Sequence, residues 1–470
     1  MRLHETKITK KLNKQIMRMP SVLLCLCILV LSLSGCTKTY VTSEWNEVIS
    51  ENMPESIIDS ATNEKPAENA SPQSNSSSGI KDNGKDSNTD NTVSVGEQES
   101  YYVHSTEAMR KASILNKGDT TRLASKIKAA LNDKKHNTTI ACFGDSITAG
   151  SAASSMSKHY SSLFRDWWNN NISSAVTLIN KGVGGTISYF GLHWADEAIL
   201  KHKPDIIFIE YVNDKDEDKD SLYAMDSLVR KCLSLDNKPA VILLEMSYNL
   251  NGTLSNAQKT HMKVAKPYGV PVISWRDAIK NPILNGELKW RDVSPDIVHP
   301  NDKGHALLTE LMVSYVSSVV PQAATVGEPT AFSAAAVTDE LYKNAKILDR
   351  NNLTAVDEGS FTAVAKADPF RNGWATTSGG SITFKMSFKT LGLIMHKTND
   401  GVNGKITVEV DGKKIIFDGS DEIDGNWNES YDNIWAKRLY TYDSYAERTV
   451  KVTVVNGALD DFKILGWMVS

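Results

Sequence analysis

The seven residues from Gly144 to Gly150 constrain the fold more than any other part of this 470-residue chain. They follow an apolar run over residues 139–143, Thr-Ile-Ala-Cys-Phe, that is typical of a buried strand. A strand that ends in Gly-Asp-Ser, with Gly150 just downstream, predicts a turn that exposes Ser146 at the carboxyl edge of a sheet. We therefore expect an α/β fold whose strand ends carry the reactive side chains.

A second segment supplies the groups that such a serine needs. A serine hydroxyl attacks at neutral pH only with a histidine base, which a carboxylate orients. Both groups occur in one short stretch far downstream, Asp-Ile-Val-His-Pro-Asn, which contains Asp296 and His299. Either segment alone is a weak signal, but their combination predicts nucleophilic catalysis by Ser146.

The first 36 residues predict export rather than a folded element. Six basic residues precede an apolar segment, residues 21–34, that is too short to span a bilayer stably. The segment ends Leu-Ser-Gly-Cys, which resembles a bacterial lipobox. The resemblance implies cleavage after residue 35 and a diacylglycerol on the sulfur of Cys36, so we expect a lipid-anchored envelope or cell-surface protein. An ordinary signal peptide that happens to contain a cysteine is the alternative.

The charge balance argues against nucleic acid as the main partner. The whole chain has a net charge of −4, and removal of residues 1–35 makes it −9. Of the five cysteines, Cys142 and Cys232 remain once the signal segment and the proposed anchor are set aside. We expect both to be small buried hydrophobic residues, with a disulfide between them as the alternative. Because no histidine or cysteine spacing is typical of metal ligands, we expect no metal and no cofactor.

The composition divides the rest of the chain into a tether and a folded region. Residues 36–100 are poor in large apolar side chains and rich in Ser, Asn, Asp, Glu and Gly, which predicts a disordered polar tether. From residue 101 to about 322 helical and strand-like patterns alternate. Helices are expected over residues 122–132, 156–170, 188–201, 221–235, 257–265 and 302–319, and strands over residues 139–143, 175–180, 205–211, 240–244 and 270–275. This alternation predicts a doubly wound parallel sheet with helices on both faces.

The pattern changes again in the last third of the chain. A second linker begins at Pro321, and period-two runs then cover residues 381–386, 405–410 and 449–454, separated by turns such as Asp-Gly and Asn-Gly. They predict an all-β accessory domain over residues 335–470, with a sandwich or jelly-roll arrangement. Its aromatic residues either stack on sugar rings or fill the core of the domain; the candidates are Trp374, Trp427, Trp435 and Tyr440. Trp467 is expected in a buried closing strand.

Four blocks together resemble the SGNH (GDSL-type) hydrolase family over about residues 130–320. They are the Gly-Asp-Ser turn, the glycine-rich stretch of residues 180–186, the Tyr-Val-Asn-Asp stretch of residues 211–214, and the Asp296–His299 loop. The resemblance implies a flavodoxin-like sheet that brings the blocks to one edge. It identifies Ser146 as the nucleophile, His299 as the base and Asp296 as the residue that orients the base.

The same resemblance implies an oxyanion hole. Its donors are the backbone N–H of Ser146, the backbone N–H of Gly185 and the side-chain amide of Asn213, with Gly184 as the alternative to Gly185. Two positions depart from the family pattern. Ile147 replaces the usual leucine, and Tyr211 stands where a glycine is expected, so Tyr211 is predicted to narrow the pocket or to alter the approach of Asn213.

Each of these residues also has a structural interpretation. Ser146 is alternatively a helix N-cap, Asn213 the centre of an Asx turn, and Asp296 a cap or the partner of a lysine. The glycines of residues 182–185 are alternatively needed only for a tight connection. We expect structural roles for Asp145 and His305. Three tryptophans at helical positions are expected in the core, with sugar platforms as the alternative: Trp167, Trp168 and Trp194.

The four blocks predict a serine esterase that acts through an acyl-enzyme. The expected surface anchor, the tether, the β domain and a resemblance to bacterial carbohydrate esterases favour removal of O-acetyl groups from a polysaccharide. The alternatives are a small-ester or lipid acylhydrolase, a cell-envelope O-acetyltransferase, and a lipid-anchored glycan-binding protein with a degenerate hydrolase fold. The last is disfavoured because binding alone does not require the intact catalytic set. If the β domain engages the glycan, a chain that ends near Val320 keeps activity on a soluble acetate and loses it on polymer. If the domain only packs on the catalytic region, both activities fall together.

Overall fold

The computed structural model describes residues 104–133, 135–363, 368–397, 405–418, 433–455 and 462–470. The predicted signal segment, Cys36, the tether and Trp427 lie outside these described residues. Within the described ranges, no helix has the length and apolar character needed to cross a membrane.

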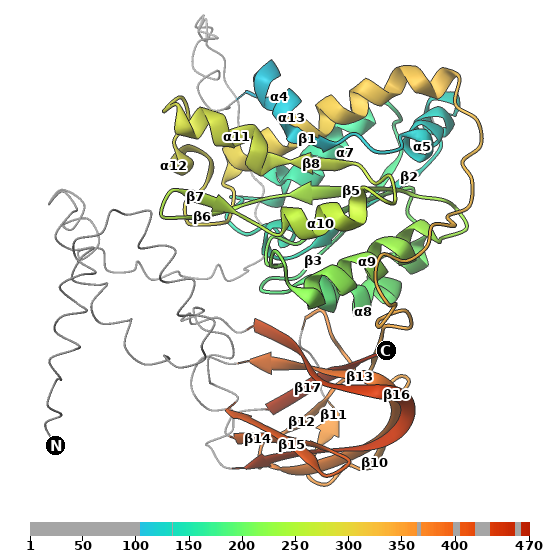
Figure 1. The fold of residues 1–470 in the computed structure, drawn as a ribbon, viewed down its shortest axis with the longest axis vertical. Coiled ribbons are helices and arrows are strands. Elements are labelled where there is room, and N and C mark those ends of the chain that lie inside the picture. The colour runs from blue at the N-terminus through green and yellow to red at the C-terminus, as the bar shows by residue number, and fades with distance from the viewer. Residues whose placement is uncertain (1–103, 134, 364–367, 398–404, 419–432, 456–461) are drawn as a thin grey trace, which may run out of the picture. The chain divides into compact units, whose positions relative to one another are not determined.

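A six-stranded sheet flanked by helices organises the first folded region (Figure 1). Its strand order is β1-β8-β5-β4-β2-β3, in which β1 runs antiparallel to β8 and the other neighbours are parallel. The bounds are β1 (Ile114–Asn116), β2 (Thr138–Gly144), β3 (Val176–Gly182), β4 (Ile206–Glu210), β5 (Ala240–Glu245) and β8 (Val272–Ser274). The five parallel strands have the flavodoxin-like order. The order in which the chain adds strands to the sheet reverses between β2 and β4, while the strands themselves stay parallel. The predicted doubly wound sheet is thus confirmed.

Alternation along each strand distributes the core over two faces of this sheet. Ile140 and Cys142 of β2 belong to one apolar cluster, whereas Ala141 and Phe143 belong to the other. The first cluster packs under α4 (Glu107–Ser113), α5 (Thr121–Asn132), α7 (Tyr160–Asn171), α11 (Trp275–Leu284), α12 (Trp290–Val293) and α13 (Asp302–Val319). The second packs under α8 (Ser188–Ala198), α9 (Lys219–Leu233) and α10 (Gln258–Ala265).

Two predicted helices are shorter than expected. The helix expected over residues 156–170 begins only at Tyr160, because His159 has an extended backbone and its side chain accepts a hydrogen bond from the N–H of Ser161. Met156–Lys158 instead form a 3-10 turn, η3. The helix expected to reach residue 201 ends at Ala198 and is followed by a second 3-10 turn, η4 (Leu200–His202).

The two remaining cysteines do not form the alternative disulfide. Cys142 and Cys232 are both free and buried, as the sequence predicted. Burial raises the pKa of each thiol to about 12. Both residues therefore act as apolar side chains of the two core clusters.

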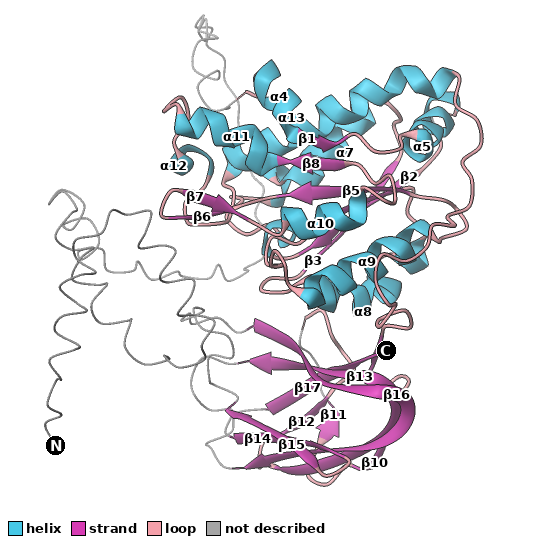
Figure 2. Cartoon of the chain, viewed as in Figure 1, coloured by secondary structure: helices cyan, strands magenta, loops and turns pink. Residues whose placement is uncertain are grey.

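The second folded region is entirely antiparallel (Figure 2). Its nine strands are β9 (Lys346–Leu348), β10 (Ala355–Asp357), β11 (Thr362–Ala363), β12 (Trp374–Thr376), β13 (Gly380–Lys397), β14 (Lys405–Val410), β15 (Lys413–Asp418), β16 (Asn433–Val455) and β17 (Phe462–Val469). The three predicted runs lie within β13, β14 and β16. The long pair β13 and β16 has register shifts after Phe388 and after Leu391, where the regular ladder is interrupted.

The β strands also contribute to the core under α8 and α9. Ile394 of β13 and Leu465 and Met468 of β17 are buried in the same apolar cluster as Tyr189 of α8. An ion pair between Arg438 of β16 and Asp220 of α9, at 2.6 Å, adds a polar contact. The helix that follows the glycine-rich block is therefore covered on one side by β-domain side chains.

Candidate active site

The structure brings Ser146, His299 and Asp296 into one hydrogen-bonded chain. Ser146 begins the short helix α6 (Ser146–Ala149) directly after β2. Its Oγ lies 2.9 Å from Nε2 of His299, and Nδ1 of the same ring lies 2.7 Å from Oδ2 of Asp296. A neutral imidazole in this arrangement donates from Nδ1 to the carboxylate and accepts at Nε2 from the serine hydroxyl.

The carboxylate of Asp296 is fixed by its own loop. Its Oδ1 accepts the backbone N–H groups of Val298 and His299, both at 2.7 Å, while Oδ2 faces the ring. Partial burial raises the pKa of Asp296, but the hydrogen bonds from the His299 ring and from these backbone groups lower it, and the net pKa lies below its ordinary value. Asp296 is thus held ionised and aimed at Nδ1.

Asp145 connects the serine turn to the Tyr-Val-Asn-Asp block. Its Oδ1 accepts the N–H of Ile147 at 3.1 Å, which makes Asp145 the N-cap of α6, and Ser146 is not the cap. Its Oδ2 accepts the N–H of Asn213 at 3.2 Å. Burial and the neighbouring Glu210 carboxylate raise the pKa of Asp145 well above its ordinary value. The predicted structural role of Asp145 is confirmed and extends to a second block.

The glycine-rich turn that carries the predicted oxyanion-hole glycine lies beside the serine. A Cβ built on Gly184 would be 3.7 Å from Cβ of Ser146, and Gly185 has a φ of +71°, which a glycine adopts at little cost. Nδ2 of Asn213 donates to the carbonyl of Thr186 at 3.0 Å, and this closes the glycine-rich turn against the Asn213 loop. One hydrogen of the Asn213 amide is thereby used, and one remains for a ligand.

Tyr211 is buried in the core rather than in the pocket, contrary to the first of the two effects expected of it. Only 2% of its surface is exposed, and its ring meets Phe143 edge to face at 6.0 Å. Its hydroxyl occupies the place where a Cβ on Gly191 would stand, at 1.9 Å. Tyr211 therefore packs under α8, on the face of the sheet that α8, α9 and α10 cover.

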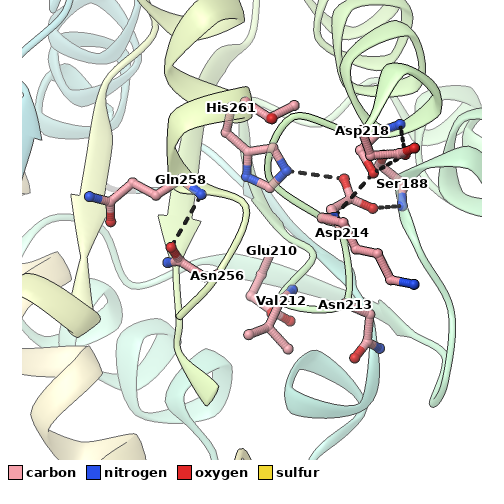
Figure 3. Close-up of polar contacts among 12 residues, drawn as sticks. Ser188, Glu210, Val212, Asn213, Asp214, Asp218, Asn256, Gln258 and His261 are labelled. Carbon is pink, nitrogen blue, oxygen red and sulfur yellow. Dashed lines mark hydrogen bonds and ion pairs between the residues drawn. The ribbon is translucent and has the colours of Figure 1, made fainter. Parts of the chain in front are cut away.

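A buried ionic group, which the sequence did not predict, supports the Asn213 loop. His261 of α10 lies 3.0 Å from Asp214 (Figure 3) and, on the other side of its ring, 2.8 Å from Glu245. Burial by itself lowers the pKa of His261, but the two carboxylates raise it to about 10. The other oxygen of Asp214 accepts the N–H of Ser188 at the start of α8, at 2.8 Å. The ionic group thus joins α10, α8 and the loop that carries Asn213.

The remaining residues expected to be structural are core residues. His305 is fully buried, with its ring 4.6 Å from that of His159, and burial lowers the pKa of His305 to about 3. Trp168 is fully buried, while Trp167 and Trp194 are partly buried against the two clusters. In the described part of the chain, no group of three or more His, Cys, Asp or Glu side chains is arranged to hold a metal ion.

The β-domain aromatics favour the core interpretation over sugar stacking. Trp374 and Trp467 are buried, and both pack against Phe384. Tyr440 is also buried and donates its hydroxyl to the carbonyl of Val408 at 2.7 Å. These three rings present no open face to a ligand. Trp435 is partly buried and packs on Phe417.

Comparisons with known proteins agree with the geometry of the site. Residues 142–307 match the model of the GDSL-like Lipase/Acylhydrolase family. We call residues 142–307, which are similar to GDSL-type acylhydrolases, the acylhydrolase domain. No curated protein matches the sequence significantly.

Solved structures extend the likeness beyond this acylhydrolase domain. A two-domain esterase (CEX) active on acetylated mannans, co-crystallised with mannopentaose, has 26% sequence identity and a TM-score of 0.68; the match covers 77% of this chain and 97% of that one. A second structure of that esterase gives the same identity and TM-score and is covered to 98%. The acetyl xylan esterase AlAXEase has 18% identity and a TM-score of 0.33, with coverage of 37% and 98%. The acylhydrolase domain is that of a serine ester hydrolase.

Proposed function

We propose that the protein removes acetyl groups from a polysaccharide by nucleophilic catalysis at Ser146. The observation that carries this proposal is the hydrogen-bonded chain Ser146–His299–Asp296 at the carboxyl edge of the sheet. Oγ of Ser146 attacks the acetyl carbonyl carbon while its proton passes to Nε2 of His299. The tetrahedral intermediate then expels the sugar oxygen, which takes that proton and leaves as a hydroxyl.

Water completes the cycle on the acetyl-enzyme. His299 accepts a proton from the water as its oxygen attacks the acyl carbon, and it returns the proton to Ser146 as acetate departs. Asp296 keeps the ring in the tautomer that leaves Nε2 open and stabilises the imidazolium that forms in each half of the reaction. Its pKa, below the ordinary value, suits this role because the carboxylate stays charged.

The developing oxyanion is assigned to three N–H donors: the backbone groups of Ser146 and Gly185 and the free amide hydrogen of Asn213. Loss of one such donor typically lowers the rate on the order of a hundredfold or more. The geometry of Asn213 supports this assignment. One hydrogen of its Nδ2 is donated to the Thr186 carbonyl, and the second hydrogen is left for the oxyanion.

For the substrate we propose an acetylated mannan. The support is the likeness over both folded regions to the esterase active on acetylated mannans, which spans 77% of this chain. The test is acetate release from acetylated mannan, acetylated xylan, pectin and peptidoglycan, measured with the native chain and with Ser146→Ala. Preferential release from mannan by the native chain alone supports the proposal, and preferential release from another polymer refutes the substrate but not the chemistry.

We further propose that a lipid on Cys36 anchors the enzyme to the envelope, on the strength of the lipobox-like sequence alone. The variant Cys36→Ser should then appear in the soluble fraction with unchanged specific activity. Sedimentation of this variant with membranes after a salt wash would refute the anchor.

A further inference from the structure

A hairpin that the sequence did not predict reaches the proposed oxyanion hole. It consists of β6 (Tyr248–Leu250) and β7 (Thr253–Ser255), which follow β5 and precede α10 along the chain. The hydroxyl of Tyr248 donates a short hydrogen bond to Oδ1 of Asn213. The next residue, Asn249, donates its backbone N–H to the carbonyl of Ile297 at 2.8 Å, within the Asp296–His299 loop. The hairpin therefore contacts both the oxyanion side and the base side of the site.

The Tyr248 contact completes the restraint of the Asn213 amide. The Thr186 carbonyl accepts one hydrogen from Nδ2, and the Tyr248 hydroxyl donates to Oδ1, so both ends of the amide are held. A flipped amide would place Oδ1 against the Thr186 carbonyl and lose that bond. With the plane fixed, the second Nδ2 hydrogen has one direction open to it.

Tyr248 is suited to donate rather than to accept. Its side chain is partly buried, and this burial together with the charges of Asp145 and Glu210 raises the pKa of Tyr248 above its ordinary value. The hydroxyl therefore keeps its proton throughout the range in which the esterase chemistry operates. A neutral donor also avoids adding a negative charge beside a developing oxyanion.

We propose that Tyr248 is a positioning residue that holds the Asn213 amide in the direction of the tetrahedral oxyanion. The inference rests on the proposed serine ester hydrolysis and adds to it a residue outside the four SGNH blocks. Tyr248 acts through Asn213, and its hydroxyl is not itself an oxyanion donor. Because removal of a whole donor costs about a hundredfold or more, loss of the group that aims it should cost less, about tenfold in kcat.

The test is a double-substitution cycle with a small chromogenic acetate as substrate. Tyr248→Phe, Asn213→Ala, the double variant and Ser146→Ala are compared with the native chain, with kcat, KM and melting temperature measured for each. Tyr315→Phe is the matched control, because Tyr315 is likewise a tyrosine withdrawn in part or whole from solvent, and it donates its hydroxyl to the backbone carbonyl of Lys117 at 2.7 Å. Assays are run below the lowest melting temperature, and Tyr248→His replaces Tyr248→Phe if the latter does not fold.

The expected result is a loss of about tenfold in kcat for Tyr248→Phe with KM little changed, and no loss for Tyr315→Phe. In the Asn213→Ala background the Tyr248 substitution should have little further effect, because its target is gone. An equal loss in both backgrounds, a change confined to KM, or unchanged kinetics would each overturn the positioning role. Activity that survives Ser146→Ala would instead refute the proposed chemistry, so the two failures are distinguishable.

Discussion

Nε2 of His299 lies 2.9 Å from Oγ of Ser146, although 153 positions separate the two residues in the chain. The contact forms because β2 ends at Gly144 and the loop before α13 meets the same edge of the parallel sheet. The order of the sheet thus places the proposed nucleophile and the proposed base, from opposite ends of the acylhydrolase domain, within hydrogen-bond reach.

Ser146→Ala should abolish hydrolysis of a small acetyl ester and leave the fold unchanged. Oγ of Ser146 is hydrogen-bonded to Nε2 of His299. The helix α6 is capped by Asp145, so it does not depend on the serine hydroxyl. Initial rates and circular dichroism check the prediction. A folded variant with activity within a few-fold of the native chain contradicts it.

Asp296→Asn should lower kcat by about a thousandfold or more and change KM little, because an amide opposite Nδ1 favours the wrong imidazole tautomer. Asp292→Asn is the matched control in the same segment, since Asp292 accepts the N–H of Lys289 at 2.9 Å and caps α12. The control should keep its turnover and lose little stability, because an asparagine oxygen can still accept the Lys289 N–H. If Asp296 were only a cap, its variant would behave like the control.

The protein should become less stable as the pH rises from near neutral toward 10, because the stabilising contribution of the charged His261 is then lost. Its pKa in the folded state is raised to about 10, whereas an unfolded histidine titrates near about 6.5. The stabilisation is complete below the unfolded value and is lost as the pH passes through the folded value, with a slope of at most about 1.4 kcal/mol per pH unit. Urea unfolding across this range should show the slope in the native chain and a reduced slope in His261→Gln. Equal slopes would show that His261 is not charged in the fold.

Gly191→Ala should destabilise the protein, because the new methyl group would overlap the Tyr211 hydroxyl at 1.9 Å. Overpacking of this kind typically costs about 1–3 kcal/mol. Gly327→Ala is the control, since a Cβ there would meet nothing within 4 Å. Thermal unfolding of the two variants checks the prediction, and equal melting temperatures would place the Tyr211 ring elsewhere.

A chain that ends near Val320 should lose activity on a soluble acetate and on polymer together. The truncation removes Ile394, Leu465 and Met468 from the cluster that covers α8, the helix that follows the glycine-rich block. In the full-length chain, Met468→Asp should lower the melting temperature, whereas Ile416→Asp, at a position 63% exposed on β15, should not. Retained activity on the soluble acetate alone would favour a glycan-engaging β domain instead.

The sequence by itself determined the parallel sheet, the antiparallel second region, the Gly-Asp-Ser turn and the Asp296–His299 loop. These features depend on residues that are close in sequence. They are the spacing of apolar residues, the residues that form turns, and an Asp-x-x-His motif whose carboxylate and ring meet within one loop. The hydrogen bonds from Val298 and His299 to Asp296 span two and three residues, so the motif itself contains them.

Only the tertiary structure decided how side chains from different segments meet. Glu210 beside Asp145, Tyr248 on the Asn213 amide and His261 between Glu245 and Asp214 all join residues that are distant in sequence. No periodicity marks them, because a polar residue at a strand end or on a helix looks the same whether it faces solvent or a buried carboxylate. Sheet order and strand register determine which such groups become neighbours, and burial then sets their charge.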